Sequence, residues 1–403
     1  WVFGDGTAQN PYLIENAAQL AYMSSEINSN AGAYIGAYFD LVADIDLNGY
    51  NWTPIGTSAN PFQGHFNGND HTINDLNITV NGNNPQYVGL FGYISNAEIS
   101  NVHIIGNGTI SVRGTSTTFY IGSIAGYAIG STIDNCSNQS NLIVNHTGTT
   151  TSYNTYLGGL VGYLTGNTSP PPGSLSYLTN SMNQGRINFS INFQSATSSS
   201  YSWYHYIGGV VGSTRYATIE NCGNLDSLFL MNDVATYSKE SYIYAGGITG
   251  YVYGTSALPI NIKKSYNKGK IVLNNKATCN SSSYYANAYG YIGGIIGYCN
   301  TGYITISDCY NRGDLKPKAY SYHSSYYNNS HNYVAGITGY LPSSTITITN
   351  CYNTGNVPST YTPYGGNAGT GTIYYYHDCI GYNASTYTQT NNNYYLSTCE
   401  CTV

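Results

Sequence analysis

Residues 291–298 read Tyr-Ile-Gly-Gly-Ile-Ile-Gly-Tyr, and seven copies of this pattern organise the chain. Each copy is followed by an element such as Ile-Thr-Asn-Cys at residues 348–351, and then by a short apolar segment that contains glycine. The copies begin at Tyr87, Tyr120, Tyr156, Tyr206, Tyr244, Tyr291 and Tyr333, which lie 33 to 50 residues apart. Self-similarity with a period of this size is typical of a repeat architecture.

Apolar residues alternate with polar residues and glycine inside each copy, which is the period of a strand with one buried face. A unit of two or three short strands cannot bury its apolar face alone, but stacked units form a continuous core with strands about 4.8 Å apart. The pattern therefore predicts an all-β fold, a parallel β-helix. Equivalent residues then form ladders along the axis, and we expect one of hydrogen-bonded asparagines. Its members are Asn138, Asn183, Asn224, Asn267, Asn311 and Asn353, with Ile104 in the first repeat.

The first 85 residues lack the repeat and contain a segment, 15–27, with apolar residues at helical spacing. A solenoid needs a polar cap over its end. We therefore predict two parts. Residues 1–85 form a capping segment with a short helix and the first irregular coils, and residues 86–403 form one continuous solenoid.

Charged residues make up 7% of the 403 residues, and the net charge is −6. Lysine and arginine are scattered, so the chain lacks the basic footprint of a nucleic-acid-binding protein or of one that binds an anionic membrane. No run approaches the ~20 apolar residues that span a bilayer, so we expect no direct membrane span. The chain begins at Trp1 without Met, which we interpret as a secreted product whose leader was removed.

Tyrosine is unusually frequent, with 46 residues. The segments 195–205, 279–290 and 316–332 vary in length between repeats and are rich in Ser, Tyr and Asn. Insertions at one repeat position emerge on one side of a solenoid, and a tyrosine ring offers a large contact area at low entropic cost. We therefore expect a shared tyrosine-rich binding face. Its candidate residues are Tyr201, Tyr204, Tyr284, Tyr285, Tyr320, Tyr322, Tyr326 and Tyr327.

Asn-x-Ser/Thr sequons and cysteines suggest two kinds of covalent modification. The glycosylation candidates are Asn51, Asn77, Asn107, Asn145, Asn167, Asn188, Asn280, Asn328 and Asn383, although chance in an Asn-rich chain could produce most of them. Four of the nine cysteines share one repeat position that holds Val or Ser elsewhere, which predicts packed free thiols. The disulfide candidates are Cys379, Cys399 and Cys401, with Cys379 paired to either of the others.

The sequence provides no catalytic residue, metal site or cofactor site. Asp40, Asp44 and Asp46 are the best acidic cluster, but a capped turn explains them better than a cation does. The histidines lack a second ligand at metal spacing. We therefore expect the chain not to be an enzyme.

Several stretches resemble the GLUG-motif family of bacterial and archaeal extracellular surface proteins. They are Val-Gly-Leu-Phe-Gly-Tyr at 88–93, Leu-Gly-Gly-Leu-Val-Gly-Tyr at 157–163, and the leader-like elements at 1–14, 44–48, 52–56 and 62–73. The resemblance implies a right-handed β-helix found in adhesins and in larger surface proteins, including non-catalytic regions of IgA-cleaving metallopeptidases. It implies no ligand and no catalytic residue.

Three hypotheses for function follow. The first is an extracellular, adhesin-like module that binds a glycan or a protein on a cell surface. The second is a structural subunit that assembles end to end with other copies into a fibre or surface layer. The third and weakest is a polysaccharide lyase or hydrolase, which would need an acidic cluster in a groove.

Overall fold

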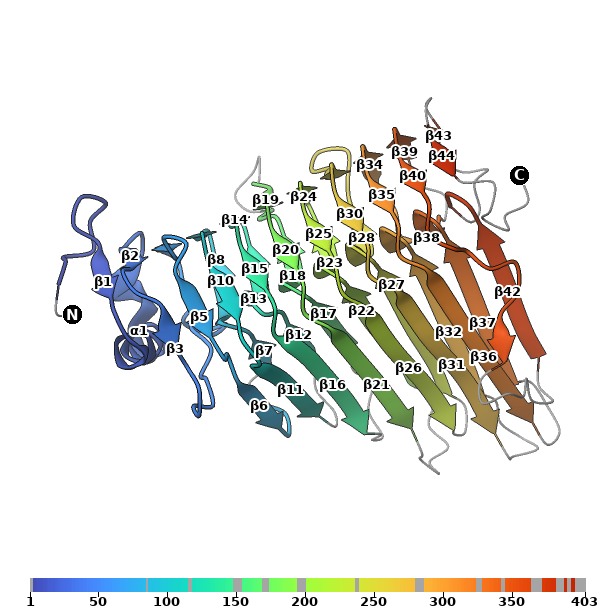
Figure 1. The fold of residues 1–403 in the computed structure, drawn as a ribbon, viewed down its shortest axis with the longest axis horizontal. Coiled ribbons are helices and arrows are strands. Elements are labelled where there is room, and N and C mark those ends of the chain that lie inside the picture. Colours follow the sequence, from blue (N-terminus) through green and yellow to red (C-terminus); the bar gives the residue numbers. More distant parts are fainter. Residues whose placement is uncertain are drawn as a thin grey trace.

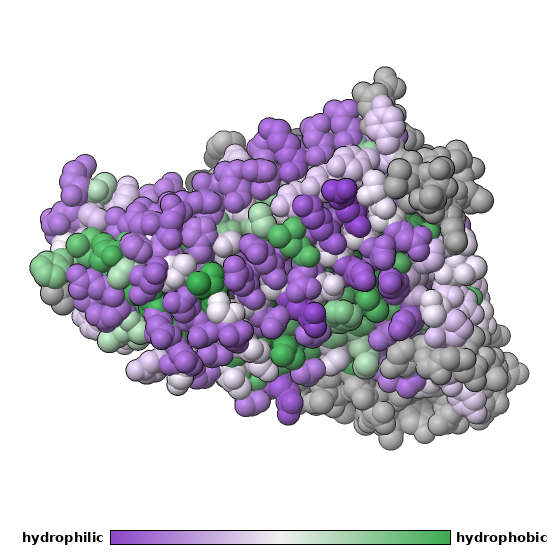
Figure 2. Space-filling model, in the orientation of Figure 1, coloured by the Kyte–Doolittle hydropathy of each residue, from purple (hydrophilic) through white to green (hydrophobic). Residues whose placement is uncertain are grey.

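The chain forms a parallel β-helix in the computed structural model, as the repeat predicts (Figure 1). The structure describes residues 3–84, 86–114, 118–147, 154–168, 174–193, 201–235, 239–279, 286–323, 328–341, 345–363, 372–381, 388–389 and 393–395. The coils stack from the N-terminal helix to the C-terminal strands, and the solenoid widens along its length (Figure 1). Hydrophilic residues cover most of the face shown in Figure 2, with hydrophobic residues scattered among them.

Five parallel sheets run along the solenoid, numbered here in the order in which a coil visits them. Sheet 1 contains β7 (Tyr87–Val88), β12 (Phe119–Ile121), β17 (Asn154–Gly158), β22 (Tyr201–Gly208), β27 (Lys239–Gly246), β32 (Ala286–Gly293), β37 (Asn328–Ala335) and β42 (Thr372–Asp378). Sheet 2 contains β8 (Phe91–Ser95), β13 (Ala125–Ile129), β18 (Val161–Thr165), β23 (Val211–Arg215), β28 (Thr249–Tyr253), β33 (Ile296–Cys299) and β38 (Thr338–Tyr340).

The other three sheets complete each coil. Sheet 3 contains β1 (Tyr12–Ile14), β2 (Tyr38–Leu41), β4 (His65–Asn67), β9 (Glu98–Ser100), β14 (Thr132–Asp134), β19 (Ser176–Thr179), β24 (Ala217–Glu220), β29 (Ile260–Lys263), β34 (Tyr303–Ser307), β39 (Thr345–Thr349) and β43 (Thr388–Gln389). Sheet 4 contains β3 (Ile45–Asp46), β5 (Thr72–Asn74), β10 (His103–Ile105), β15 (Ser137–Asn138), β20 (Met182–Asn183), β25 (Gly223–Asn224), β30 (Tyr266–Asn267), β35 (Tyr310–Asn311), β40 (Tyr352–Asn353) and β44 (Tyr394–Tyr395). Sheet 5 contains β6 (Ile78–Asn81), β11 (Thr109–Gly114), β16 (Asn141–Thr147), β21 (Ile187–Phe193), β26 (Leu228–Ala235), β31 (Ile271–Cys279), β36 (Leu315–His323) and β41 (Thr362–Pro363).

The predicted N-terminal helix is present as α1 (Ala17–Asn30), followed by the 3₁₀ helix η1 (Ala31–Tyr34). Asn16 caps α1, because its side chain accepts a hydrogen bond from the Gln19 backbone N–H. One face of the helix buries Leu20, Met23 and Ile27. Strands β2 and β4 already pair into sheet 3, so coils begin well before residue 85. The division of the chain at residue 85 stays a prediction.

The predicted asparagine ladder is confirmed. Its six members are fully buried, and each donates a side-chain hydrogen bond of 2.7–3.0 Å to the next, from Asn138 through to Asn353. Each member also donates to a backbone carbonyl two residues ahead, as Asn267 does to Gly269 at 2.9 Å. A buried amide is expensive unless it is hydrogen-bonded, so the ladder fixes the register between successive coils.

The glycine that precedes Ile248 in the repeat is required by the asparagine ladder. A Cβ added at Gly247 would lie 2.4 Å from the Cβ of Asn267 and 2.2 Å from the Gly294 carbonyl oxygen. Gly159, Gly209, Gly294 and Gly336 meet the ladder in the same way in their own coils. The two halves of the repeat therefore pack directly against each other across the core.

The described parts of the inserts extend the strands of sheets 1 and 5. Strands β22, β27, β32 and β37 of sheet 1 and β26, β31 and β36 of sheet 5 are eight or nine residues long, and the two sheets pack face to face as a fin. Its interior holds the fully buried Trp203 together with small and polar residues: Val234, Ala277, Ala286 and Ala288 form one cluster, and Asn232 donates to Asn275 at 2.9 Å. The widening seen in Figure 1 is this fin.

Candidate binding site

Two columns of tyrosines line the corner between sheets 1 and 2, and we call this surface the tyrosine elbow. The first column is Tyr87, Tyr120, Tyr156, Tyr206, Tyr244, Tyr291, Tyr333 and Tyr376, with neighbouring ring centroids 4.7–5.4 Å apart. The second column is Tyr93, Tyr127, Tyr163, Tyr251, Tyr298 and Tyr340. Outward side chains of the two sheets meet there, as Tyr87 and Tyr93 do at 5.2 Å, so the elbow is concave.

The ring faces of the first column pack against neighbouring tyrosines. Within the first column the rings are stacked, with interplanar angles of 3–23°. The rings from Tyr87 to Tyr333 also make edge-to-face contacts with the second column: Tyr120, for example, contacts Tyr127 at 5.2 Å and Tyr163 at 6.1 Å. An intact stretch of the elbow therefore presents ring edges and phenol hydroxyls to a ligand, and not ring faces.

The elbow makes the fold sensitive to alkali. Burial, reinforced by neighbouring phenols, raises the pKa of Tyr120, Tyr251 and Tyr298 to about 12, against about 10 in an unfolded chain. The raised folded pKa favours the neutral phenols, so their contribution to stability is complete below about pH 10 and is lost as the pH rises towards 12. We expect the free energy of unfolding in urea to fall above about pH 10, and phenolate absorbance of these rings to appear together with unfolding. Full phenolate absorbance at about pH 10 in the folded chain would contradict this.

The second column is interrupted at Ser213. Strand pairing places Ser213 in register with Tyr163 on one side and with Tyr251 on the other. As a result, Tyr156 and Tyr206 each have one edge-to-face contact with the second column, at 5.1 and 5.0 Å, where Tyr244 and Tyr291 have two. A hollow of about 270 Å³ lies at this interruption. Its lining is Tyr156, Tyr163, Tyr206, Ser213, Thr214, Arg215, Tyr251 and Tyr253, and we call it the gap pocket.

Of the predicted insert tyrosines, the three whose side chains the structure describes lie on two different faces. Tyr204 belongs to the outer side of sheet 1, where it stacks on Tyr242 at 4.9 Å beside the elbow. Tyr320 and Tyr322 belong to β36 in sheet 5, on the other side of the fin. The described parts of the inserts lie in paired strands with two outer faces, and these three tyrosines divide between the two faces. Tyr201 lies in β22, but its side chain is outside the described residues, as are Tyr284, Tyr285, Tyr326 and Tyr327.

A ladder next to the first column went unpredicted. Tyr204, Tyr242, Tyr289, His331 and Tyr374 stack with centroids 4.5–4.9 Å apart on the outer side of sheet 1. Burial lowers the pKa of His331 to about 4, so this imidazole is neutral at physiological pH. Alternation around Tyr242 and Tyr289 is visible in the sequence and indicates strands. To predict the ladder, however, one must also know the register between inserts of different length.

The modification candidates differ in exposure. Asn51 and Asn107 are exposed, and Asn77, Asn145, Asn167 and Asn188 are partly exposed. Asn328 is fully buried and accepts a hydrogen bond from the Ala286 N–H at 2.8 Å, so its amide is enclosed in the folded chain. Asn280 and Asn383 lie outside the described residues, as do Cys399 and Cys401. Cys379 is buried and is not among the free thiols, and its pairing stays a prediction.

The shared cysteine position holds free, buried thiols, as predicted: Cys136, Cys222, Cys309 and Cys351. Each thiol lies 3.2–3.3 Å from the carbonyl two residues before it. The serines in the same column donate to equivalent carbonyls, as Ser265 does to Lys263 at 2.9 Å. This position therefore selects a small side chain with a weak donor.

The acidic residues near the N-terminus do not converge. Asp44 accepts from the Thr72 N–H at 2.8 Å, and Asp46 accepts from the Asn48 N–H at 2.8 Å. Asp40 lies in a different sheet, and burial raises its pKa. The three carboxyl groups thus serve separate turns and strands, which agrees with the capped-turn interpretation.

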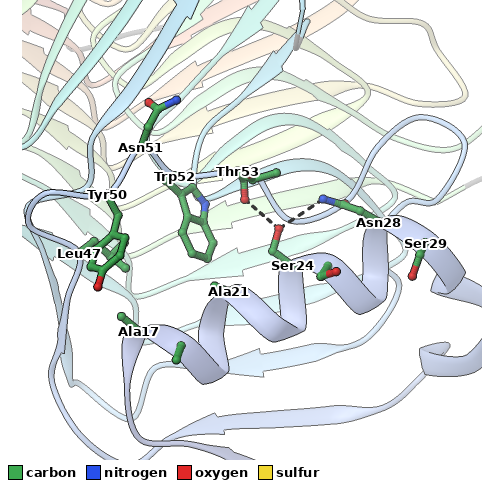
Figure 3. A pocket seen from close by; sticks show the side chains of 12 residues that line it. Ala17, Ala21, Ser24, Asn28, Ser29, Leu47, Tyr50, Asn51, Trp52 and Thr53 are labelled. Carbon is green, nitrogen blue, oxygen red and sulfur yellow. Dashed lines mark hydrogen bonds between the residues drawn. The ribbon is translucent and has the colours of Figure 1, made fainter.

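A second hollow, of about 580 Å³, lies between α1 and the first coils (Figure 3). Trp52 faces the helix beside Ala21, and small residues of α1 form the opposite wall (Figure 3). The polar groups at its edge already anchor the helix, since Ser24 donates to the Thr53 carbonyl at 2.8 Å and Asn28 donates to Ser24 at 3.3 Å. This hollow is the seam between the helix and the solenoid.

Comparison with known proteins finds relatives for about a third of the chain. No family model matches it, so the likeness to the GLUG-motif family stays a proposal. A protein named "Putative Gly-rich membrane protein" from Evansella cellulosilytica is 39% identical over 143 residues, which cover 33% of this chain and 15% of the relative. "Halomucin" from Haloquadratum walsbyi is 30% identical over 145 residues, which cover 32% of this chain and 2% of the relative. The chain thus matches a small part of each relative's length.

Two solved structures are similar over most of the chain. One is titled as a "putative immunoglobulin A1 protease from Bacteroides ovatus", with a TM-score of 0.49, 19% identity, and coverage of 92% of this chain and 86% of that one. The other is named "IgA1 Protease", with a TM-score of 0.43, 15% identity, and coverage of 83% of this chain and 21% of that one. The prediction that the chain is not an enzyme is contradicted by these protease names and is withdrawn. A likeness at this level transfers no catalytic residue.

The names of the relatives bear on where the protein is located. One relative is named as a membrane protein, which is compatible with a cell-surface or extracellular protein. Within the described ranges, no helix is long and apolar enough to cross a membrane.

Proposed function

We propose that this chain is an extracellular surface module that binds glycans through the tyrosine elbow. The observation that carries the proposal is the concave surface itself, which runs the length of seven coils and is lined by phenol groups on rings that are fixed by stacking. Because the rings are already ordered, binding costs little side-chain entropy.

The chemistry of the elbow suits sugars. A phenol hydroxyl both donates and accepts a hydrogen bond, which matches the hydroxyl groups of a glycan. The two columns consist of neutral tyrosines, and Arg215 is the cation that lines the gap pocket. Such a lining of neutral hydroxyl groups favours a hydroxyl-rich ligand.

A glycan array with matched variants tests the proposal. The test variant combines Tyr93→Phe, Tyr127→Phe and Tyr298→Phe, which remove second-column hydroxyls, keep the rings and leave the gap pocket intact. We expect the wild-type chain to bind, and the variant to bind roughly tenfold or more weakly, because three hydrogen bonds are lost.

The control for this array lies on another surface. Tyr266, Tyr310 and Tyr352 form a stacked ladder on sheet 4, with centroids 5.1 and 5.0 Å apart. Their combined change to Phe removes three hydroxyls away from the elbow and is expected to leave binding unchanged. Absence of wild-type binding to every glycan, or equal losses in the two variants, would contradict the proposal. Release of reducing or unsaturated sugars from a bound polysaccharide would show turnover as well as binding.

End-to-end assembly into a fibre or surface layer stays a prediction, because much of the C-terminal end lies outside the described residues. Electron microscopy of the purified chain at high concentration distinguishes filaments from monomers.

A further inference from the structure

The gap pocket lies where the second column of the elbow lacks a ring. Adjacent strands of a sheet lie about 4.8 Å apart, so the strands that carry Tyr163 and Tyr251, two apart in the register, are separated by about 9.6 Å. One ligand ring inserted midway would therefore lie one stacking distance from a tyrosine on each side. No second-column ring lies between these two tyrosines, and the hollow at this interruption leaves room for the ring of a ligand beside them.

The pocket is sized for one ring. Its volume of about 270 Å³ is slightly below the ~300–1,000 Å³ of pockets for drug-sized ligands. Ser213 forms its base and is 3% exposed, so this residue contributes to the site by the absence of a ring and not by a bond to the ligand. Tyr156 and Tyr206 close it from the first column.

A cation without a carboxylate partner lies at the pocket. The Cζ atom of Arg215 is 4.5 Å from the ring centroid of Tyr216 and 4.8 Å from that of Tyr253, and its Nη2 donates to the Tyr216 hydroxyl at 2.7 Å. Within the described part of the chain, Arg215 forms no ion pair, and its buried Nε has no hydrogen-bond partner. A guanidinium held in this way retains donors for an anion.

The residue that follows Arg215 has an unusual backbone conformation. Tyr216 has a φ of 53°, in the left-handed region, where a bulky residue is an outlier. Asn96 and Gly130 take the equivalent corner in earlier coils with φ values of 51° and 59°, and both residue types tolerate it. Strain of this kind is kept where it positions a functional group, and here it places the Tyr216 ring against the guanidinium.

We propose that the gap pocket binds a single uronic acid residue of an acidic polysaccharide. The pyranose ring inserts between Tyr163 and Tyr251, and its carboxylate accepts hydrogen bonds from the Arg215 guanidinium. The proposal rests on the proposed function of the elbow in glycan binding and names the class of glycan.

A sugar acid fits better than an aromatic side chain of a protein partner. Both would stack on the two tyrosine faces. The phenol-lined elbow continues along the axis on both sides of the pocket, from Tyr87 to Tyr376, so the neighbouring sugars of the same polysaccharide meet hydroxyl groups there. A lone aromatic side chain would use the pocket and leave this adjoining surface unused.

Isothermal titration calorimetry with the whole chain tests this inference. The probes are oligogalacturonate, its neutral methyl ester, and N-acetyltyrosine as a model of an aromatic side chain that carries a carboxylate. We expect oligogalacturonate to bind at least about tenfold more tightly than the methyl ester, since hydrogen bonds to charged groups are the stronger ones. N-acetyltyrosine is expected to show no binding, and a preference for it over oligogalacturonate would overturn the proposal.

Two variants locate the site. Ser213→Tyr completes the second column and is expected to abolish binding, while the fold is retained because tyrosine occupies this slot in neighbouring coils. Arg215→Gln is expected to weaken oligogalacturonate binding about tenfold or more, whereas Arg312→Gln, on an exposed corner of another sheet, is expected to have no effect. Full binding by Ser213→Tyr would place the ligand elsewhere on the elbow and overturn this inference alone. Absence of wild-type binding to charged and neutral glycans alike would overturn the proposed function too.

Discussion

Replacing Asn267 with alanine is expected to lower the free energy of unfolding by about 3 kcal/mol or more. Its side chain accepts from Asn224 at 2.8 Å and donates to Asn311 at 2.8 Å and to the Gly269 carbonyl at 2.9 Å. All three partners lie in a core without water access, and a buried polar group that loses its partner costs about 1–3 kcal/mol. Urea unfolding followed by circular dichroism measures the change.

The control is another asparagine of the same coil. Asn261 lies in β29 with its side chain partly exposed, and its side-chain contact is a 3.5 Å hydrogen bond to Thr218. Asn261→Ala is expected to change the free energy of unfolding by less than about 0.5 kcal/mol. If the two variants were equally stable, the ladder would not hold the coils in register.

Replacing Gly247 with alanine is expected to be as damaging. The added Cβ would lie 2.2 Å from the Gly294 carbonyl oxygen and 2.4 Å from the Cβ of Asn267, and neither is the end of a flexible side chain. The coils must separate to admit the methyl group, and overpacking of a tight core costs about 1–3 kcal/mol or more. We expect a loss of about 3 kcal/mol in the free energy of unfolding, measured in the same urea titration.

Gly32→Ala provides the matched control. Gly32 lies in η1, and the nearest atom to its added Cβ is 3.9 Å away. Alanine there is expected to leave stability unchanged or to raise it slightly, because it restricts the unfolded chain. An equal loss from Gly32→Ala and Gly247→Ala would show that the loss reflects glycine's backbone freedom and not contact with the ladder.

The stacked fold could be predicted because its signals are local and repeated. Alternation within each of the seven copies that begin with tyrosine indicates a strand, and recurrence of asparagine at one position predicts a ladder. Contact between the two positions, such as Gly247 with Asn267, could not be read in advance because it crosses the core. The asparagines at the corner between sheets 3 and 4 were missed in the same way: Asn101 has a φ of 55° and donates to Asn67 at 2.8 Å.

The fin was missed for a different reason. Segments 195–205 and 316–332 are rich in Ser, Tyr and Asn, a composition typical of loops. The interior of the fin is polar, however, and pairs its amides and hydroxyls across the two sheets, as Asn275 does with the Ala288 carbonyl at 2.9 Å. A strand whose buried side is polar lacks the alternation that identifies a half-buried strand.

The candidate site could be predicted in part. Serine at position 213, where other copies carry tyrosine, is visible in the sequence, as is Arg215 two residues later. Ser213 and Arg215 form a pocket only because Tyr163 and Tyr251 flank Ser213 in register and because Tyr216 has a left-handed conformation. The sequence of a single repeat specifies neither the register between coils nor the backbone conformation at Tyr216.

A crystal structure of the chain with oligogalacturonate is the most direct test of the central claim that the interrupted tyrosine elbow is a glycan-binding surface. The account predicts a pyranose ring between the faces of Tyr163 and Tyr251, with its carboxylate within about 3 Å of the Arg215 guanidinium. A pocket that remains empty, with the sugar bound on another surface such as the sheet 4 ladder or the seam beside α1, would contradict it.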